Sequence, residues 1–338
     1  MIFTSDNASG AAPEVMAAVV AANEGYTMPY GDDVGTARVE AMVREIFAAP
    51  EARVFLVATG TAANALALAT LAPPWGSILC HRIAHIEVDE CGAPEFFSGG
   101  AKLALLDGDE AKITPQGLEA ALAPQASVHN VQPSALSITQ ATERGAVYGV
   151  GEVAALAAIA GRHGLRVHMD GTRFANALVA TNATPAAMSH EAGVDVLCLG
   201  ATKCGALAAE AVVLFDPSLA REFELRRKRG GHLFSKMRFV AAQMEAWLTD
   251  GLWLRLAGHA NAMGARLADG LRAKGVPVLS AAEANLLFAH FSDEQHAALQ
   301  AAGARYYPDP APEGGVHARL VASFATRAED VDALLAAL

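Results

Sequence analysis

Short apolar runs alternate with longer helical patterns over the first 250 residues of the chain. The pattern predicts strands over residues 53–57, 166–169, 194–199 and 211–215, and helices over residues 61–72 and 151–163. Continuous runs of Val, Leu and Ile between helices are typical of strands that are buried on both faces. We therefore expect an α/β fold with a mostly parallel central sheet and helices on both of its faces.

The pattern changes near Asp250, where a long helical stretch begins. We expect a helix over residues 252–274, strands over 276–279, 285–291 and 317–322, helices over 293–301 and 328–337, and a Pro/Gly-rich loop over 308–315. This mixture of short strands and helices indicates a smaller α/β domain at the C-terminus. The predicted division is an N-terminal arm (1–15), a large domain (16–249) and a small domain (250–338).

The composition and net charge of the chain exclude some classes of protein. The 338 residues include 25 Lys+Arg and 36 Asp+Glu, a formal net charge of −11, and 53% of them are hydrophobic. So large an apolar share excludes a disordered chain. The acidic balance argues against nucleic acid as a partner, because phosphate contacts need a basic surface. We expect a small-molecule substrate instead.

Residues 54–80 contain no charged side chain, so this stretch is the candidate for a membrane-spanning helix. Gly60, Pro73 and Pro74 interrupt this stretch, so it predicts two shorter elements joined by a turn. The four cysteines show neither the paired spacing of a zinc site nor the density of a disulfide scaffold. We expect a cytoplasmic protein with reduced core thiols, no membrane segment and no metal ligands.

A Thr59-Gly60-Thr61 motif lies between the first predicted strand and the helix that follows it. Free N–H groups at a helix start, a glycine that permits close approach and a threonine hydroxyl together suit a phosphate group. The glycine spacing does not match a dinucleotide fingerprint, and no lysine follows as in a Walker loop. An ordinary strand–helix turn is the alternative interpretation.

The segment His168-Met169-Asp170-Gly171 lies at the end of another predicted strand. Ligands of open α/β sheets gather at the C-terminal ends of the strands. A carboxylate at this position could bind a cationic ring nitrogen. Asp170 could equally cap the next helix.

Lys203 follows a predicted buried strand directly and is flanked by Gly200 and Gly205. Lysines prefer exposed positions, so this environment is unusual. Burial and neighbouring cations lower the pKa of a lysine, which favours a Schiff-base nucleophile. A lysine that extends to the surface is the alternative.

Taken together, the three segments indicate one cofactor, pyridoxal 5′-phosphate. A phosphate cradle, a carboxylate for the pyridine nitrogen and a lysine for the aldehyde are the groups that this cofactor needs. They occur here in that order along the chain.

With these residues in view, the sequence resembles the low-specificity threonine aldolase / phenylserine aldolase family. The resemblance covers nearly the full chain, and it implies the aspartate-aminotransferase-like fold, also called PLP-dependent fold type I. Besides the three segments above, it is carried by Ser5-Asp6-Asn7, Pro29 to Asp33, Ala84-His85-Ile86 with Glu90, Thr139 to Glu143, Arg226 to His232, and His317 to Val321.

The resemblance implies cofactor roles for five residues. Lys203 matches the lysine that binds the cofactor aldehyde, and Asp170 matches the partner of the ring nitrogen. His85 matches an imidazole that stacks on the ring. Gly60 and Thr61 match the phosphate-binding residues.

The resemblance also implies a substrate site. Ser5 and Arg319 match residues that bind the substrate carboxylate, and Arg173, beside that pocket, is assigned to both cofactor and substrate. Arg229 matches an arginine that reaches the phosphate, often of a neighbouring subunit. His129 matches a second histidine near the substrate hydroxyl.

The implied reaction is aldol cleavage of L-β-hydroxy-α-amino acids such as L-threonine, L-allo-threonine and L-phenylserine to glycine and an aldehyde. Lys203, Asp170, His85 and His129 are the catalytic candidates, and either histidine or a water could be the base for the hydroxyl proton. Many relatives have Glu-Asn-Thr-His where this chain has residues 139–142 (Thr-Gln-Ala-Thr), which favours the branch that also accepts phenylserine.

Three further expectations concern alternatives and assembly. An aminotransferase or a β-eliminating lyase is the alternative enzyme, and a non-catalytic sensor of the cofactor is the alternative outside enzymes. The basic segment Arg221 to Lys236 is interpreted as an anion-facing loop at a subunit boundary rather than an exposed helix. The family implies a homodimer or homotetramer with shared active sites.

Overall fold

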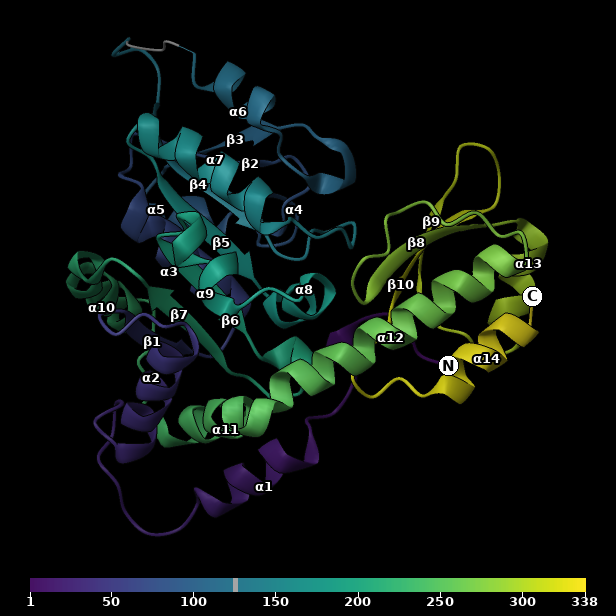
Figure 1. The fold of residues 1–338 in the computed structure, drawn as a ribbon, viewed down its shortest axis with the longest axis horizontal. Coiled ribbons are helices and arrows are strands. Elements are labelled where there is room, and N and C mark those ends of the chain that lie inside the picture. The colour runs from purple at the N-terminus through teal and green to yellow at the C-terminus, as the bar shows by residue number, and fades with distance from the viewer. Residues whose placement is uncertain (124–126) are drawn as a thin grey trace.

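A seven-stranded sheet forms the centre of the larger part of the molecule (Figure 1). The computed structural model describes residues 1–123 and 127–338. The strands are β1 (Arg53–Val57), β2 (Gly76–His81), β3 (Lys102–Leu106), β4 (Gln132–Thr139), β5 (Arg166–Gly171), β6 (Val196–Gly200) and β7 (Glu210–Leu214), in the spatial order β1-β7-β6-β5-β4-β2-β3. Only β7 runs against its neighbours, so the expectation of a mostly parallel sheet is confirmed.

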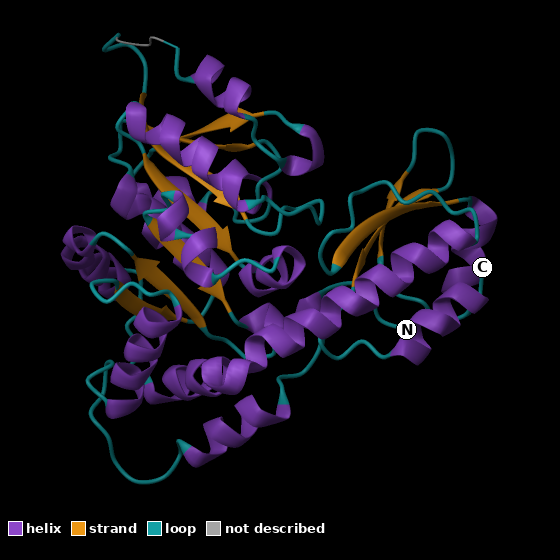
Figure 2. Cartoon of the chain, viewed as in Figure 1, coloured by secondary structure: helices purple, strands orange, loops and turns teal. Residues whose placement is uncertain are grey.

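Helices cover both faces of this sheet (Figure 2). One face is covered by α1 (Pro13–Ala21), α2 (Val34–Ile46), α6 (Pro115–Ala121), α7 (Val150–Arg162), α8 (Phe174–Thr181), α9 (Pro185–Met188) and α11 (Arg238–Leu248). The other is covered by α3 (Gly60–Leu71), α4 (His85–Val88), α5 (Ala93–Ser98) and α10 (Ala220–Arg229). Short 3-10 helices are η1 (Asp6–Ala8), η2 (Asp109–Ala111), η3 (His190–Ala192), η4 (Thr202–Cys204), η5 (Pro217–Leu219) and η6 (Thr249–Gly251).

The burial of both sheet faces explains the continuous apolar runs in the sequence. In β6, Leu197 and Leu199 pack into the core on one side, while Val196 and Cys198 pack into the core on the other. Successive side chains of a strand point to opposite faces, so a strand that is covered twice needs an apolar residue at every position.

A three-stranded antiparallel sheet forms the smaller part of the molecule. It consists of β8 (Leu286–Phe291), β10 (Val316–Val321) and β9 (Tyr307–Pro310), in the order β8-β10-β9. Helices α12 (Leu252–Ala273), α13 (Asp293–Ala301) and α14 (Ala328–Ala336) accompany it. The long helix α12 packs against α8 at one end and against α14 and β8 further along, so it connects the two parts (Figure 1).

The N-terminal residues pack into the core of this smaller part and form hydrogen bonds with its backbone. Phe3 is fully buried in its core, its N–H donates to the Arg305 carbonyl oxygen at 2.7 Å, and its carbonyl accepts from Val321 at 2.9 Å. The predicted arm therefore contributes core contacts at its first residues. The predicted divisions at residues 15 and 249 remain expectations.

Three local predictions are wrong. Residues 276–279 form an isolated bridge at Val278 rather than a strand, and Pro277 has no N–H to donate to a ladder. The predicted loop over 308–315 is wrong at residues 308–310, which belong to β9, because prolines are tolerated on an edge strand. The basic segment is helical over Ala220–Arg229, with the i,i+4 pair Glu222–Arg226.

Two further expectations concern thiols and membranes. All four cysteines are free, and three of them are buried, but Cys91 is exposed and is not a core thiol. Among the described residues, no helix is both long enough and apolar enough to span a membrane.

Candidate active site

The C-terminal ends of β1, β2, β5 and β6 lie at one edge of the large sheet, because these four strands run parallel. The segments that follow β1, β2 and β6 carry Gly60, His85 and Lys203, and Asp170 lies near the end of β5. A cavity of about 430 Å³ opens at this edge and is lined by Gly60, Thr61, His85 and Lys203. The fold thus brings together candidate residues that lie up to about 140 positions apart in the sequence, from Gly60 to Lys203.

The start of α3 forms the predicted phosphate cradle. Thr59 caps the helix, since its hydroxyl accepts from the Ala62 N–H at 3.2 Å. The N–H groups of the first helical turn have no acceptor within the helix, which leaves Gly60 and Thr61 available for an anion. Both residues line the cavity.

Asp170 is buried behind the cavity, with its carboxylate fixed by three hydrogen bonds. The N–H and the hydroxyl of Thr172 donate to Oδ1 at 3.0 and 2.7 Å, and the Asn64 amide donates to Oδ2 at 2.9 Å. Burial alone would raise the pKa of Asp170, but these hydrogen bonds and the charge of His85 lower it overall. Asp170 is therefore a buried anion at neutral pH.

Lys203 lies in η4, just after the close contact between β6 and the segment that follows β5. A Cβ on Gly200 would lie 2.7 Å from the Thr172 Cα, so this approach requires glycine. Burial lowers the pKa of Lys203, and the charge of Arg173 lowers it further. A larger fraction of Lys203 is therefore neutral and nucleophilic than for an exposed lysine.

A buried relay connects His85 to Asp170. His85 Nδ1 lies 2.8 Å from Glu90 Oε1, and the Asn64 amide donates to the same oxygen at 2.8 Å. The bond to Glu90 raises the pKa of His85, while burial raises the pKa of Glu90. The donor atoms of His85, Glu90 and Asp170 lie within 4.8 Å of one another, a spacing that a metal ion could use. The Asn64 N–H donors already join the two carboxylates, which makes this a hydrogen-bonded network.

A second cavity of about 600 Å³ adjoins the first and shares His85 and Lys203 with it. Ser5, Arg173 and Arg319 line this cavity, as the resemblance implies. Burial lowers the pKa of Arg319, and its only described hydrogen bond is a long one of 3.4 Å to the Thr4 carbonyl oxygen. Its guanidinium group is therefore the one best able to accept a carboxylate.

Arg173 is already engaged by a carboxylate of the chain. Its Nε and Nη2 donate to the two oxygens of Asp6 at 2.8 and 3.0 Å, and both side chains are buried. Asn285 donates to Asp6 at 3.1 Å as well. Direct contact of Arg173 with a substrate or cofactor would require this pair to rearrange.

Arg229 and His129 lie outside both cavities. Arg229 is exposed at the end of α10, and His129 is exposed on the segment before β4. The structure of one chain does not bring either residue to the site.

Sequence reasoning missed several residues of the site, including Asn64 and the buried carboxylates Glu143 and Glu210. Burial raises the pKa of Glu210 to about 7, and it accepts from the Ala201 N–H at 2.9 Å beside Lys203. Glu143 accepts from the His85 N–H at 2.9 Å. Glu90, one of the residues that carry the resemblance, is only 3% exposed. A lone acidic residue at the start of the apolar β7 was the available signal for Glu210.

The residues present fit pyridoxal phosphate. The helix start offers N–H donors for a phosphate, Asp170 offers an anion for a ring nitrogen, and Lys203 offers an amine for an aldehyde. Two buried oxygens beside the cavity, Asn64 Oδ1 and Glu90 Oε2, have no hydrogen-bond partner among the described residues. Unpaired buried polar atoms are costly, which is consistent with a cavity built for a polar ligand.

Comparisons with known proteins agree with this geometry. The family model described as "Beta-eliminating lyase" matches residues 3–294. The chain is 43% identical to the low specificity L-threonine aldolase of Pseudomonas aeruginosa over 97% of this chain and 94% of that protein. It is also 43% identical to the low specificity L-threonine aldolase of Pseudomonas sp. over 90% and 88% of the two chains.

A solved structure, a threonine aldolase of Leishmania major, superposes with a TM-score of 0.95 at 28% identity, covering 99% of this chain and 97% of that chain. This likeness confirms the fold class expected from the sequence. The two comparisons at 43% identity confirm the resemblance on which the site residues were transferred.

The buried pair between Asp6 and Arg173 leads to a testable prediction. Replacing Asp6 by Asn leaves a buried guanidinium without its counter-ion, so we expect the free energy of unfolding to fall by about 3–5 kcal/mol, measured by urea denaturation. The charges of Arg173 and Lys203 lower the pKa of Asp6 although burial opposes them. Its contribution is therefore fully present above the ordinary value of 3.8 and is lost as the pH falls through the folded-state pKa.

The matched control is Asp332→Asn, which removes another two-bond Asp–Arg pair, with Arg266, whose side chains are about half exposed. This change should cost less than about 1 kcal/mol. Equal losses in the two variants would contradict the role assigned to Asp6.

Proposed function

This chain belongs to the beta-eliminating lyase family of pyridoxal-phosphate enzymes and is a carbon–carbon lyase, and we propose that it cleaves L-threonine and related L-β-hydroxy-α-amino acids to glycine and an aldehyde. The observation that carries the proposal is the position of Lys203 and Arg319 on two adjoining cavities, with Asp170 behind the first and bonded to Asn64 in its wall. A cofactor site and a carboxylate site thus lie side by side.

Pyridoxal phosphate, when bound, supplies an electron-accepting ring that weakens the bonds around the carbon next to the substrate amine. Gly60 and Thr61 would bind its phosphate, and Lys203 would bind its aldehyde. Asp170, a buried anion, would hold a proton on the ring nitrogen, which keeps the ring electron-accepting.

Arg319 would bind the substrate carboxylate, with Ser5 beside it. This role is supported by the position of both residues in the second cavity, which also contains Lys203. A fixed carboxylate orients the Cα–Cβ bond, and orientation of the reacting bond is a large part of catalysis.

His85 is the proposed base for the β-hydroxyl proton. It lines both cavities, and its other nitrogen is bound to Glu90, which fixes the ring orientation. Glu90 thus acts as a positioning residue for His85.

The second cavity suits both a methyl and a phenyl substituent. It measures about 600 Å³, and its walls include the apolar side chains of Ile83, Val88 and Phe288 together with the ring of Tyr307. We infer that L-allo-threonine and L-phenylserine are substrates besides L-threonine.

Aldehyde release from the three amino acids tests the activity. Purified protein with pyridoxal phosphate should give aldehyde and glycine in equal amounts from each. Lys203→Ala should reduce turnover to background because the cofactor loses its amine partner. Lys274→Ala, an exposed lysine at the end of α12, should retain full activity. Release of a 2-oxo acid with ammonia, or transfer of the amine without aldehyde, would favour the alternative enzymes.

The pH profile of kcat tests the role of His85. A base must be neutral, so activity should rise with pH through the pKa of His85, which the bond to Glu90 raises. In Glu90→Gln the pKa of His85 should fall, and the rising limb of the profile should move to lower pH. Glu87→Gln, on the same helical turn, should leave the limb in place. A limb that stays fixed in Glu90→Gln would exclude His85 as the base.

We further propose that the cytoplasmic enzyme is a homodimer or homotetramer with shared active sites. Leu207, which is 48% exposed, lines the first cavity, and the exposed side chains of Tyr26 and Met28 precede α2. Exposed apolar surface marks contact sites where it is contiguous, and we propose that these side chains become buried in the assembly. Arg229, which is exposed, could then reach the site of a neighbouring subunit.

Light scattering combined with an activity assay tests this assembly. We expect a particle of two or four times the mass of one chain, with activity confined to it. An active monomer would contradict the shared site.

A further inference from the structure

The neighbouring strands β8 and β10 of the small sheet place two histidines opposite each other. His290 in β8 and His317 in β10 are direct partners in the antiparallel register. Their ring centroids lie 5.7 Å apart, and their side chains are 21% and 35% exposed. Directly opposed residues point to the same face, so both imidazoles are available on one surface of the sheet.

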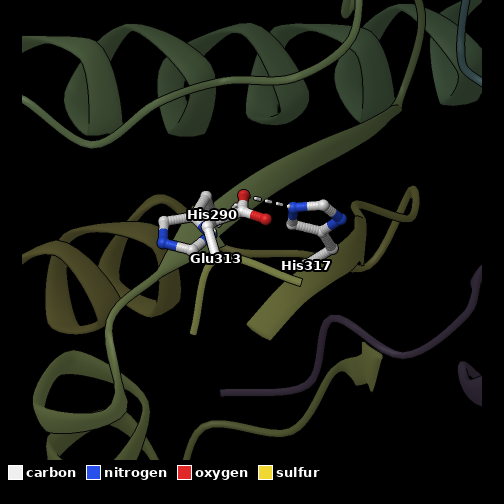
Figure 3. A group of neighbouring side chains, drawn as sticks. All are labelled: His290, Glu313 and His317. Atoms are coloured by element: carbon white, nitrogen blue, oxygen red, sulfur yellow. Dashed lines mark hydrogen bonds and ion pairs between the residues drawn. The ribbon is translucent and has the colours of Figure 1, made fainter. Parts of the chain in front are cut away.

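The turn between β9 and β10 brings a carboxylate onto this histidine pair. The Ala311 N–H donates to the Gly315 carbonyl oxygen at 3.1 Å, and Gly315 has a φ of +73°. A Cβ on Gly315 would overlap the Phe291 carbonyl oxygen, so the glycine lets the turn pack closely on the end of β8. The turn places Glu313 Oε1 2.9 Å from His317 Nε2 and 3.4 Å from His290 Nδ1. Figure 3 shows the carboxylate between the two imidazoles.

We propose that His290, Glu313 and His317 bind one divalent transition-metal ion, for which Zn²⁺ is the representative. Their ligand atoms all lie within 4.8 Å of one another. A tetrahedral ion with bonds of about 2.0–2.1 Å separates its ligands by about 3.3–3.4 Å, so small side-chain movements suffice to close the site. Two imidazoles favour Zn²⁺, Co²⁺ or Ni²⁺ over Ca²⁺ and Mg²⁺, which prefer oxygen ligands.

Ion pairing alone explains this cluster less well than a bound metal ion does. His317 forms a hydrogen bond with Glu313, but His290 Nδ1 is buried and has no hydrogen-bond partner among the described residues. A metal ion would provide that nitrogen with a partner and would bind Glu313 Oε1 at the same time. Three protein ligands leave at least one position for water.

The proposed metal site lies on the strands that form one wall of the second cavity, but its three residues line neither cavity. Arg319 and Phe288, which line the second cavity, are two residues along the strands from His317 and His290, on the same sheet face. The ion would join β8, β10 and the turn at Glu313. It would thereby hold the β9–β10 hairpin, which contributes Tyr307 to the cavity.

Metal titration of the untagged holoenzyme tests the proposal. After treatment with a chelator and dialysis, the protein is titrated with Zn²⁺ by calorimetry and with Co²⁺ by visible absorption. We expect one ion per chain, with weaker binding in acidic solution, because protonated histidine is not a ligand. Glu313→Gln and His317→Gln should each weaken Zn²⁺ binding at least about tenfold.

The matched control is His163→Gln, which removes a histidine from an exposed cluster with Glu119 and Arg162 and should leave binding unchanged. The exposure of Glu313, 55%, makes its variant the safer of the two for folding, and circular dichroism and the cofactor absorbance verify the folded state. Binding that persists undiminished in both cluster variants would overturn the proposal, as would a dissociation constant above about 1 mM in the unaltered enzyme.

Discussion

The buried carboxylate of Asp6 joins the three parts of the chain that form the active site. It lies in the N-terminal segment, it binds Arg173 after β5 of the large sheet, and it accepts from Asn285 just before β8 of the small sheet. The Asn285 amide also donates to the Ala322 carbonyl oxygen at 2.7 Å. A charge with so many partners in a dry environment fixes their relative positions, because each lost partner leaves an unpaired polar group.

The same environment controls the charges that face the substrate. Burial and the charge of Arg173 both lower the pKa of Lys203, while the hydrogen bonds of Asp170 keep that carboxylate ionised. Asp6 neutralises Arg173, and Arg144 donates to the Leu279 carbonyl oxygen, so Arg319 is the least engaged of the three guanidinium groups that line the second cavity. Pairing Arg173 internally thus leaves the neighbouring Arg319 available for a carboxylate group.

The sequence was sufficient to predict those parts of the candidate site that depend on the order of strands and motifs along the chain. Gly60, Asp170 and Lys203 each follow or end a strand, and parallel strands bring such residues to one edge, so their convergence could be predicted. Glu90 and Asn64 could not be placed in this way, because their hydrogen bonds depend on how α3 and the segment after α4 pack. The edge strand β9 was missed because its two prolines indicate a loop, and prolines are acceptable only where the partner strand lies on one side. The cluster at His290 depends on strand register, which no short motif encodes.

The burial of Phe3 has a consequence for biosynthesis. Its backbone partners Arg305 and Val321 lie more than 300 residues later in the sequence and are made after it. The core that it completes therefore stays open until β10 has been made, and closing it must overcome the entropy of a loop of more than 300 residues. The nascent large sheet consequently folds next to an unpaired N-terminal segment, and it is this late closure that brings Asp6, three residues further on, to the candidate active site.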